Sequence, residues 1–135
     1  MKKKIIIIIV SIFSSISFGI SQSGSEDNYD YEYALIEANR QKTIGNIDEA
    51  VNLYKKCIKR NPRSAVAYYE LGTIYAAFDE MSKSENMLMK AYEISPKNFW
   101  IVNAYIRVLK LNEKYREAIK VIKRYLRKDD VLELQ

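Results

Sequence analysis

The chain has 135 residues, 22 Lys and Arg against 17 Asp and Glu, and a formal net charge of +5. This length fits one domain, and the sequence has no histidine, the commonest general base and metal ligand. It contains no catalytic or phosphate-binding motif either, so we expect no enzyme activity, no cofactor and no bound metal.

The first 21 residues have the layout of an export signal. Lys2–Lys4 form a basic start, and an apolar run follows from Ile5 to Phe18, interrupted only by serines. A permanent membrane helix needs about 20 apolar residues, so this run is short for an anchor. We predict a signal peptide at 1–21, cleaved before Gln22, and a protein of the periplasm or cell envelope. Cleavage two residues earlier, an uncleaved anchor and secretion outside the cell are the alternatives.

Residues 22–29 are polar and show no apolar periodicity, which predicts a flexible leader. A first helix is expected from about Asp30 to Thr43. A second begins after Asn46, whose spacing to Glu49 has the form of a capping box, and ends before a proline at 62. Four further helices are expected at about 64–78, 81–94, 98–111 and 113–128.

Apolar and small residues recur at helical spacing in these segments and predict a buried stripe on each helix. The predicted core residues include Ala50, Val51, Tyr54, Cys57, Ile58, Tyr68, Leu71, Gly72, Tyr75, Ala76, Leu88, Ala91, Tyr92, Ala118, Ile119, Ile122, Tyr125 and Leu126. Tyr115 is also expected to pack. A single cysteine cannot form an internal disulfide, and Cys57 is interpreted as a small core residue and not as a reactive thiol.

One stretch shows a repeat. Leu71-Gly72 is followed by Tyr75, Ala91 and Pro96, and similar residue types recur at a constant spacing, which also separates the two prolines of the chain. This pattern resembles the tetratricopeptide repeat, a helix–turn–helix unit of about 34 residues. Three units are expected in a domain over 30–132, at about 31–64, 65–98 and 99–132, and residues 133–135 are a tail or the start of a further helix.

The resemblance implies an all-α, right-handed α-solenoid of about three helix–turn–helix repeats. In this family the first helix of each unit lines a concave groove that binds extended peptides or partner helices. The candidate groove residues are Leu35, Asn39, Tyr69, Glu70, Thr73, Trp100, Asn103 and Arg107, and Ala104 is expected to face the same way. For Trp100, packing at the start of its helix is the alternative. Only Asn39 matches the family's carboxylate clamp, so binding of a chaperone C-terminus is not expected.

The charges are distributed unevenly along the chain. Lys97 to Lys128 contains ten bases and two acids, whereas Glu26 to Tyr54 contains seven acids and two bases. Two solvated faces of opposite sign explain this, and a basic end that meets an acidic partner or an anionic membrane is the alternative. Removing the signal leaves 22 − 3 = 19 bases against 17 acids, a net charge too small to indicate nucleic-acid binding.

We therefore expect a non-catalytic protein-interaction scaffold of the cell envelope that binds a partner peptide or helix. A small-ligand or glycan-binding module and an adaptor to an anionic membrane are the alternatives. The last helix is expected to direct Ala118, Ile122 and Tyr125 toward the place of a next helix. This indicates either a longer repeat protein or self-association through the C-terminal edge.

Overall fold

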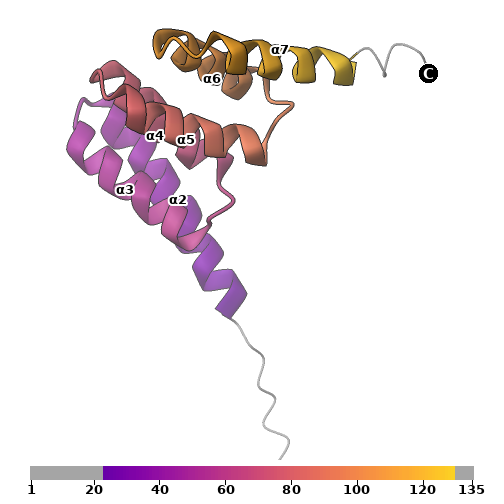
Figure 1. The fold of residues 1–135 in the computed structure, drawn as a ribbon. Helices are drawn as coiled ribbons and strands as arrows, with labels where there is room; N and C mark the ends of the chain where they lie inside the picture. The colour runs from indigo at the N-terminus through magenta and orange to yellow at the C-terminus, as the bar shows by residue number, and fades with distance from the viewer. Residues whose placement is uncertain (1–22, 130–135) are drawn as a thin grey trace, which may run out of the picture.

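The computed structural model describes residues 23–129, which form six α-helices and no strand. The helices are α2 (Ser23–Thr43), α3 (Ile47–Arg60), α4 (Ala65–Ala77), α5 (Met81–Ile94), α6 (Phe99–Leu111) and α7 (Tyr115–Asp129). They form three hairpins that lie in chain order from the bottom to the top of Figure 1. The predicted all-α solenoid of three helix–turn–helix units is confirmed.

Two predicted segments, the signal peptide at 1–21 and the tail at 133–135, lie outside the described residues. Over 23–129, no helix is long and apolar enough to cross a membrane. The same residues contain no cluster of three or more side chains of the metal-binding types.

The first helix begins earlier than the sequence predicts. α2 starts at Ser23, so most of the stretch predicted to be a leader is helical, and the predicted start near Asp30 is wrong. The segment contains no proline, so nothing in its backbone chemistry prevents the helix from starting there. The other five helices begin and end within two residues of the predicted positions.

Side-chain caps fix the starts of α4 and α6. Ser64 accepts a hydrogen bond from the Ala67 amide at 3.2 Å, and Asn98 accepts one from the Trp100 amide at 3.0 Å. The capping box predicted at Asn46 is wrong, because Asn46 makes no side-chain cap. Its Nδ2 instead donates to Gln41 Oε1 at 2.9 Å, which ties the start of α3 to the end of α2.

The core divides into two clusters of buried residues, one between the first two hairpins and one between the last two. Small residues allow close approach in the first, where Ala38, Ala50 and Cys57 are fully buried. Cys57 is thus a core residue, as predicted, and burial raises the pKa of its thiol. A raised pKa keeps the thiol protonated and unreactive.

The turn inside each hairpin repeats with the predicted period. Gly45, Asp79 and Glu113 all adopt positive φ, at 84°, 60° and 59°. Each is one repeat period from the next, since 79 − 45 = 34 and 113 − 79 = 34. The left-handed conformation is therefore built into each hairpin, although only the first turn has the glycine that suits it.

The last helix departs from the prediction. Ala118 and Val121 are buried and Tyr125 packs against the core, but the other apolar residues of α7 are exposed. The exposed residues are Tyr115, Ile119, Ile122 and Leu126. Their predicted burial is wrong because one face of α7 packs on α6, and no described helix covers the next face. Of the three residues expected to point toward the place of a next helix, Ile122 is exposed, but for Ala118 and Tyr125 the expectation is wrong because both pack toward the core.

Candidate functional site

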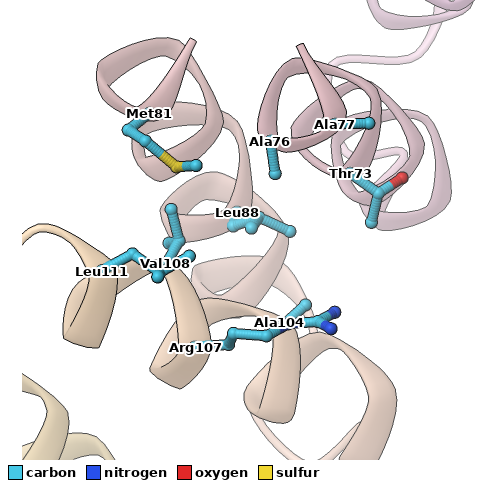
Figure 2. Close-up of a pocket in the computed structure, with 9 residues that line it drawn as sticks. All are labelled: Thr73, Ala76, Ala77, Met81, Leu88, Ala104, Arg107, Val108 and Leu111. Atoms are coloured by element: carbon cyan, nitrogen blue, oxygen red, sulfur yellow. The ribbon is translucent and has the colours of Figure 1, made fainter. Parts of the chain in front are cut away.

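A hollow of about 320 Å³ lies between α4 and α6, with α5 behind it. Figure 2 shows α4 side chains on one side, α6 side chains on the other, and Leu88 of α5 between them. The lining residues are Thr73, Ala76, Ala77, Met81, Leu88, Ala104, Arg107, Val108 and Leu111. The lining is apolar except for Thr73 and Arg107, so the hollow suits an apolar side chain beside a polar or negative group.

A second hollow, of about 230 Å³, lies between the starts of α4 and α6. Its lining residues are Val66, Tyr69, Glu70, Asn98, Trp100 and Ile101. The first hollow lies farther along the same two helices. We call the two hollows together the α4–α6 groove. An extended segment, rather than a compact one, is needed to occupy both.

Five of the eight predicted groove residues line this groove. Thr73 and Arg107 line the first hollow, and Tyr69, Glu70 and Trp100 line the second. The structure therefore brings together residues that the repeat phase alone placed on one surface.

The other predicted residues lie elsewhere or deeper. Asn103 is exposed on α6 but lines neither hollow, and Leu35 and Asn39 are half-buried on α2, outside both. Ala104 lines the first hollow, as expected, but it is only 4 % exposed and forms part of the floor.

Trp100 is 67 % exposed, so the alternative that it only packs at the start of α6 is wrong. Its ring meets Phe99 edge to face, with 5.6 Å between the ring centroids. The Asn98 cap precedes both residues and fixes the first turn of α6. The indole is thus held on a rigid element at the mouth of the second hollow.

One polar contact joins the groove to the first hairpin, and a second lies within that hairpin. Lys42 of α2 donates to Glu70 of α4 at 2.5 Å, so the Glu70 carboxylate already has a positive partner. Tyr54 Oη donates to Asn39 Oδ1 at 2.6 Å. Burial raises the pKa of Tyr54, which keeps this donor protonated. Asn39 is therefore oriented by the hairpin itself.

The sequence analysis missed several residues of the groove. Lys42, the partner of Glu70 beside the groove, was not considered. The sequence signal for it was a basic residue on the first helix of the unit that precedes the unit of Glu70. Met81 and Leu88 of α5 were missed because only first helices were expected to line the groove. Arg107 makes no ion pair within the described residues, so it is the cation most available to a ligand.

Sequence comparison identifies the repeat. Two models described as tetratricopeptide repeat match residues 41–64 and 53–86, which cover the end of α2 through part of α5. The chain is also 34 % identical over 62 residues to the protein SLOW GREEN 1, chloroplastic, of Arabidopsis thaliana. This match covers 46 % of the chain and 19 % of that protein, so the chain spans about a fifth of the relative's length.

Solved structures share the fold. The crystal structure of MamA superposes with a TM-score of 0.68 at 23 % identity, covering 78 % of this chain and 61 % of that one. The complex of the TPR2B domain of yeast Sti1 with pHsp70 gives 0.66 at 21 % identity, covering 78 % of this chain and 84 % of that one. At this identity the likeness shows the fold, and the arrangement of three hairpins agrees with it.

Proposed function

We propose that this tetratricopeptide repeat protein binds an extended segment of a protein partner in its α4–α6 groove. Tetratricopeptide repeats form protein–protein interaction scaffolds. The observation that carries the proposal for this chain is the pair of hollows in line along α4 and α6, lined by five predicted residues. The neighbour from yeast is a complex of a repeat domain with pHsp70, and this use of the fold supports the proposal.

The lining indicates what such a segment contains. The second hollow presents Tyr69 and Trp100, whose flat amphipathic rings are favoured at binding hot spots. The first presents an apolar floor with Arg107 at its side. Glu70 is neutralised by Lys42 and so does not oppose a negative ligand. We propose a segment with an apolar side chain in each hollow and an acceptor, such as a carboxylate or backbone carbonyl, beside Arg107.

Replacing Tyr69, Asn103 and Arg107 together by Ala should weaken binding of such a segment at least tenfold, because truncating one hot-spot residue alone costs about 1 kcal/mol or more. The probe is a peptide selected from a random phage-displayed library on the wild-type protein, with affinity measured by isothermal titration calorimetry. Asn103 and Arg107 are exposed, whereas Tyr69 is half-buried and packs against the core, so the thermal melt should fall only modestly.

A triple variant on the opposite side is the matched control. Asn52, Lys56 and Lys59 are exposed on α3 and line neither hollow of the groove. Their replacement by Ala should leave the affinity unchanged. Equal weakening in both variants, or unchanged affinity with a lowered melt in the first variant, would refute the groove assignment.

We further propose that the protein acts in the cell envelope, on the strength of the basic and apolar layout of residues 1–21. N-terminal sequencing of the protein recovered from the envelope fraction of an expressing bacterium should then begin at Gln22. Protein that retains Met1 and stays with the membranes would contradict removal of the signal.

A further inference from the structure

α7 presents an apolar stripe that no described helix covers. Tyr115, Ile119, Ile122 and Leu126 are 57 %, 50 %, 38 % and 53 % exposed. Their spacing of four, three and four residues puts them on one face of the helix. α7 lies at the upper edge of the stack in Figure 1, as the last described helix. The α7 stripe, as we call these four residues, is therefore open to a partner.

The stripe is distinct from the face that holds α7 in the fold. Ala118, Val121 and Tyr125 pack toward the core, and at about 3.6 residues per turn their mean direction lies about 100° around the helix from the stripe. α7 is thus anchored by one face and presents a second.

Positive charge accompanies the stripe. α7 has five exposed bases, Arg116, Lys120, Lys123, Arg124 and Arg127, and between its first residue and Arg127 the only acid is Glu117. The equivalent positions of the preceding repeat, on α5, hold Ser82, Asn86, Met89, Lys90 and Glu93. The charge is therefore a property of α7 and not of the repeat, so its occupant is expected to be anionic.

A further repeat helix fits this edge poorly. α6 packs beside α4 where α4 has Tyr69, Thr73 and Ala76. The equivalent positions of α6, one repeat later, hold Asn103, Arg107 and Lys110, all exposed. A helix docked on α6 in the same way would meet two cations and a polar amide in place of small and aromatic side chains.

A second copy of the chain is also disfavoured. Antiparallel pairing of two α7 stripes would bring the cations of both helices together. Head-to-tail contact would place the stripe near the exposed Tyr33 and Ile36 of α2, which share their face with Arg40. Glu37, the nearest acid to Arg40, already pairs with it at 2.6 Å. The antiparallel arrangement supplies no negative charge, and on the α2 face of Tyr33 and Ile36 one exposed acid, Glu32, would meet the five bases of α7.

We infer that α7 docks on an anionic lipid surface, with its stripe at the boundary between headgroups and acyl chains and its bases toward the lipid phosphates. An amphipathic helix with a basic polar side binds membranes in this way. The stripe residues line neither hollow of the groove, so the inference does not depend on the proposed function.

A fluorophore placed on the stripe tests this contact directly. In the variant Ile122→Cys, the new cysteine is labelled with an environment-sensitive nitrobenzoxadiazole fluorophore. The variant Ile36→Cys, labelled in the same way on the exposed face of α2, is the matched control. Cys57 is fully buried, and label uptake by the wild-type chain gives the blank. Vesicles of phosphatidylcholine with phosphatidylglycerol should shift the emission at position 122 to the blue and raise it severalfold. High salt should abolish the change, and phosphatidylcholine alone should not cause it.

Two charge variants in the Ile122→Cys chain sharpen the test. Arg116→Gln with Lys123→Gln should weaken vesicle affinity by about 30-fold, which corresponds to roughly fivefold per cation. Lys56→Gln with Lys59→Gln removes the same charge from α3 and should change the affinity less than twofold.

Four outcomes would overturn the inference. In the first, the emission of the label at position 122 does not change when anionic vesicles are added. In the second, it changes equally with neutral vesicles. In the third, it changes with protein concentration in the absence of vesicles, which would indicate a second copy of the chain. Equal changes at positions 36 and 122 would also overturn it. Both labelled chains carry the same residues 1–21, so a tether formed by that segment alone would not distinguish the two labels.

Discussion

Gly72→Leu is expected to lower the free energy of unfolding by about 2–3 kcal/mol and the melting midpoint by about 10–20 °C. A Cβ built on Gly72 would lie 2.6 Å from Leu88 Cγ and 3.3 Å from the Leu88 backbone nitrogen. Leu88 is itself buried, and movement of its side chain toward the first hollow would not relieve the approach to its backbone nitrogen. The new side chain would also disturb the hydrogen bond that Ser84 Oγ donates to the Gly72 carbonyl at 2.7 Å.

Thermal and urea unfolding followed by circular dichroism measure this effect. Asn52→Leu, at an exposed position of α3, introduces the same residue without a clash and should change stability by less than about 0.5 kcal/mol. Combining Gly72→Leu with Leu88→Ala should cost less than the sum of the single variants, because the truncated side chain makes room. Additive costs would show that α4 and α5 do not approach at Gly72.

Tyr54→Ala is expected to destabilise the first two hairpins by about 3–5 kcal/mol, the cost of emptying a large core site. Tyr54 is fully buried and belongs to the cluster that joins the first hairpin to α4. Urea unfolding at several protein concentrations measures the loss and excludes aggregation as its cause.

Tyr54→Phe separates packing from hydrogen bonding at the same position. It keeps the ring and removes only the bond from Oη to Asn39 Oδ1, so it should cost about 1 kcal/mol. If it costs as much as Tyr54→Ala, the hydrogen bond and not the packed ring holds the hairpin. The opposite result, no cost at all, would mean that Asn39 is not oriented by Tyr54.

Most of the fold could be predicted from the sequence because several residues that mark the repeat recur at the same spacing. Pro62 and Pro96 end second helices at the predicted period, and Gly72 marks the close helix pair. The start of α2 was missed because its first turns have neither apolar periodicity nor a proline before them. The capping box at Asn46 failed because Gln41, at the end of the preceding helix, competes for its side chain.

The groove was only partly predictable from the sequence. Periodicity gives the direction of a side chain on its own helix, but it does not give how far neighbouring helices bury that side chain. Tyr69, Thr73 and Trp100 point where the phase places them. Ala104 points the same way but is buried in the floor of the first hollow, and Met81 reaches the groove from a second helix. The exposure of the α7 stripe depends on which segments pack against α7, and no pattern inside the helix encodes them.

Residue-resolved mapping of the selected peptide tests the central claim, that the α4–α6 groove is the binding site. Amide chemical shifts of the labelled protein are followed as the peptide is added. We predict that the largest changes fall at Tyr69, Thr73 and Arg107 and at the indole of Trp100, with little change on α3. Changes centred on α3, or on the α7 stripe with the groove unaffected, would contradict the account.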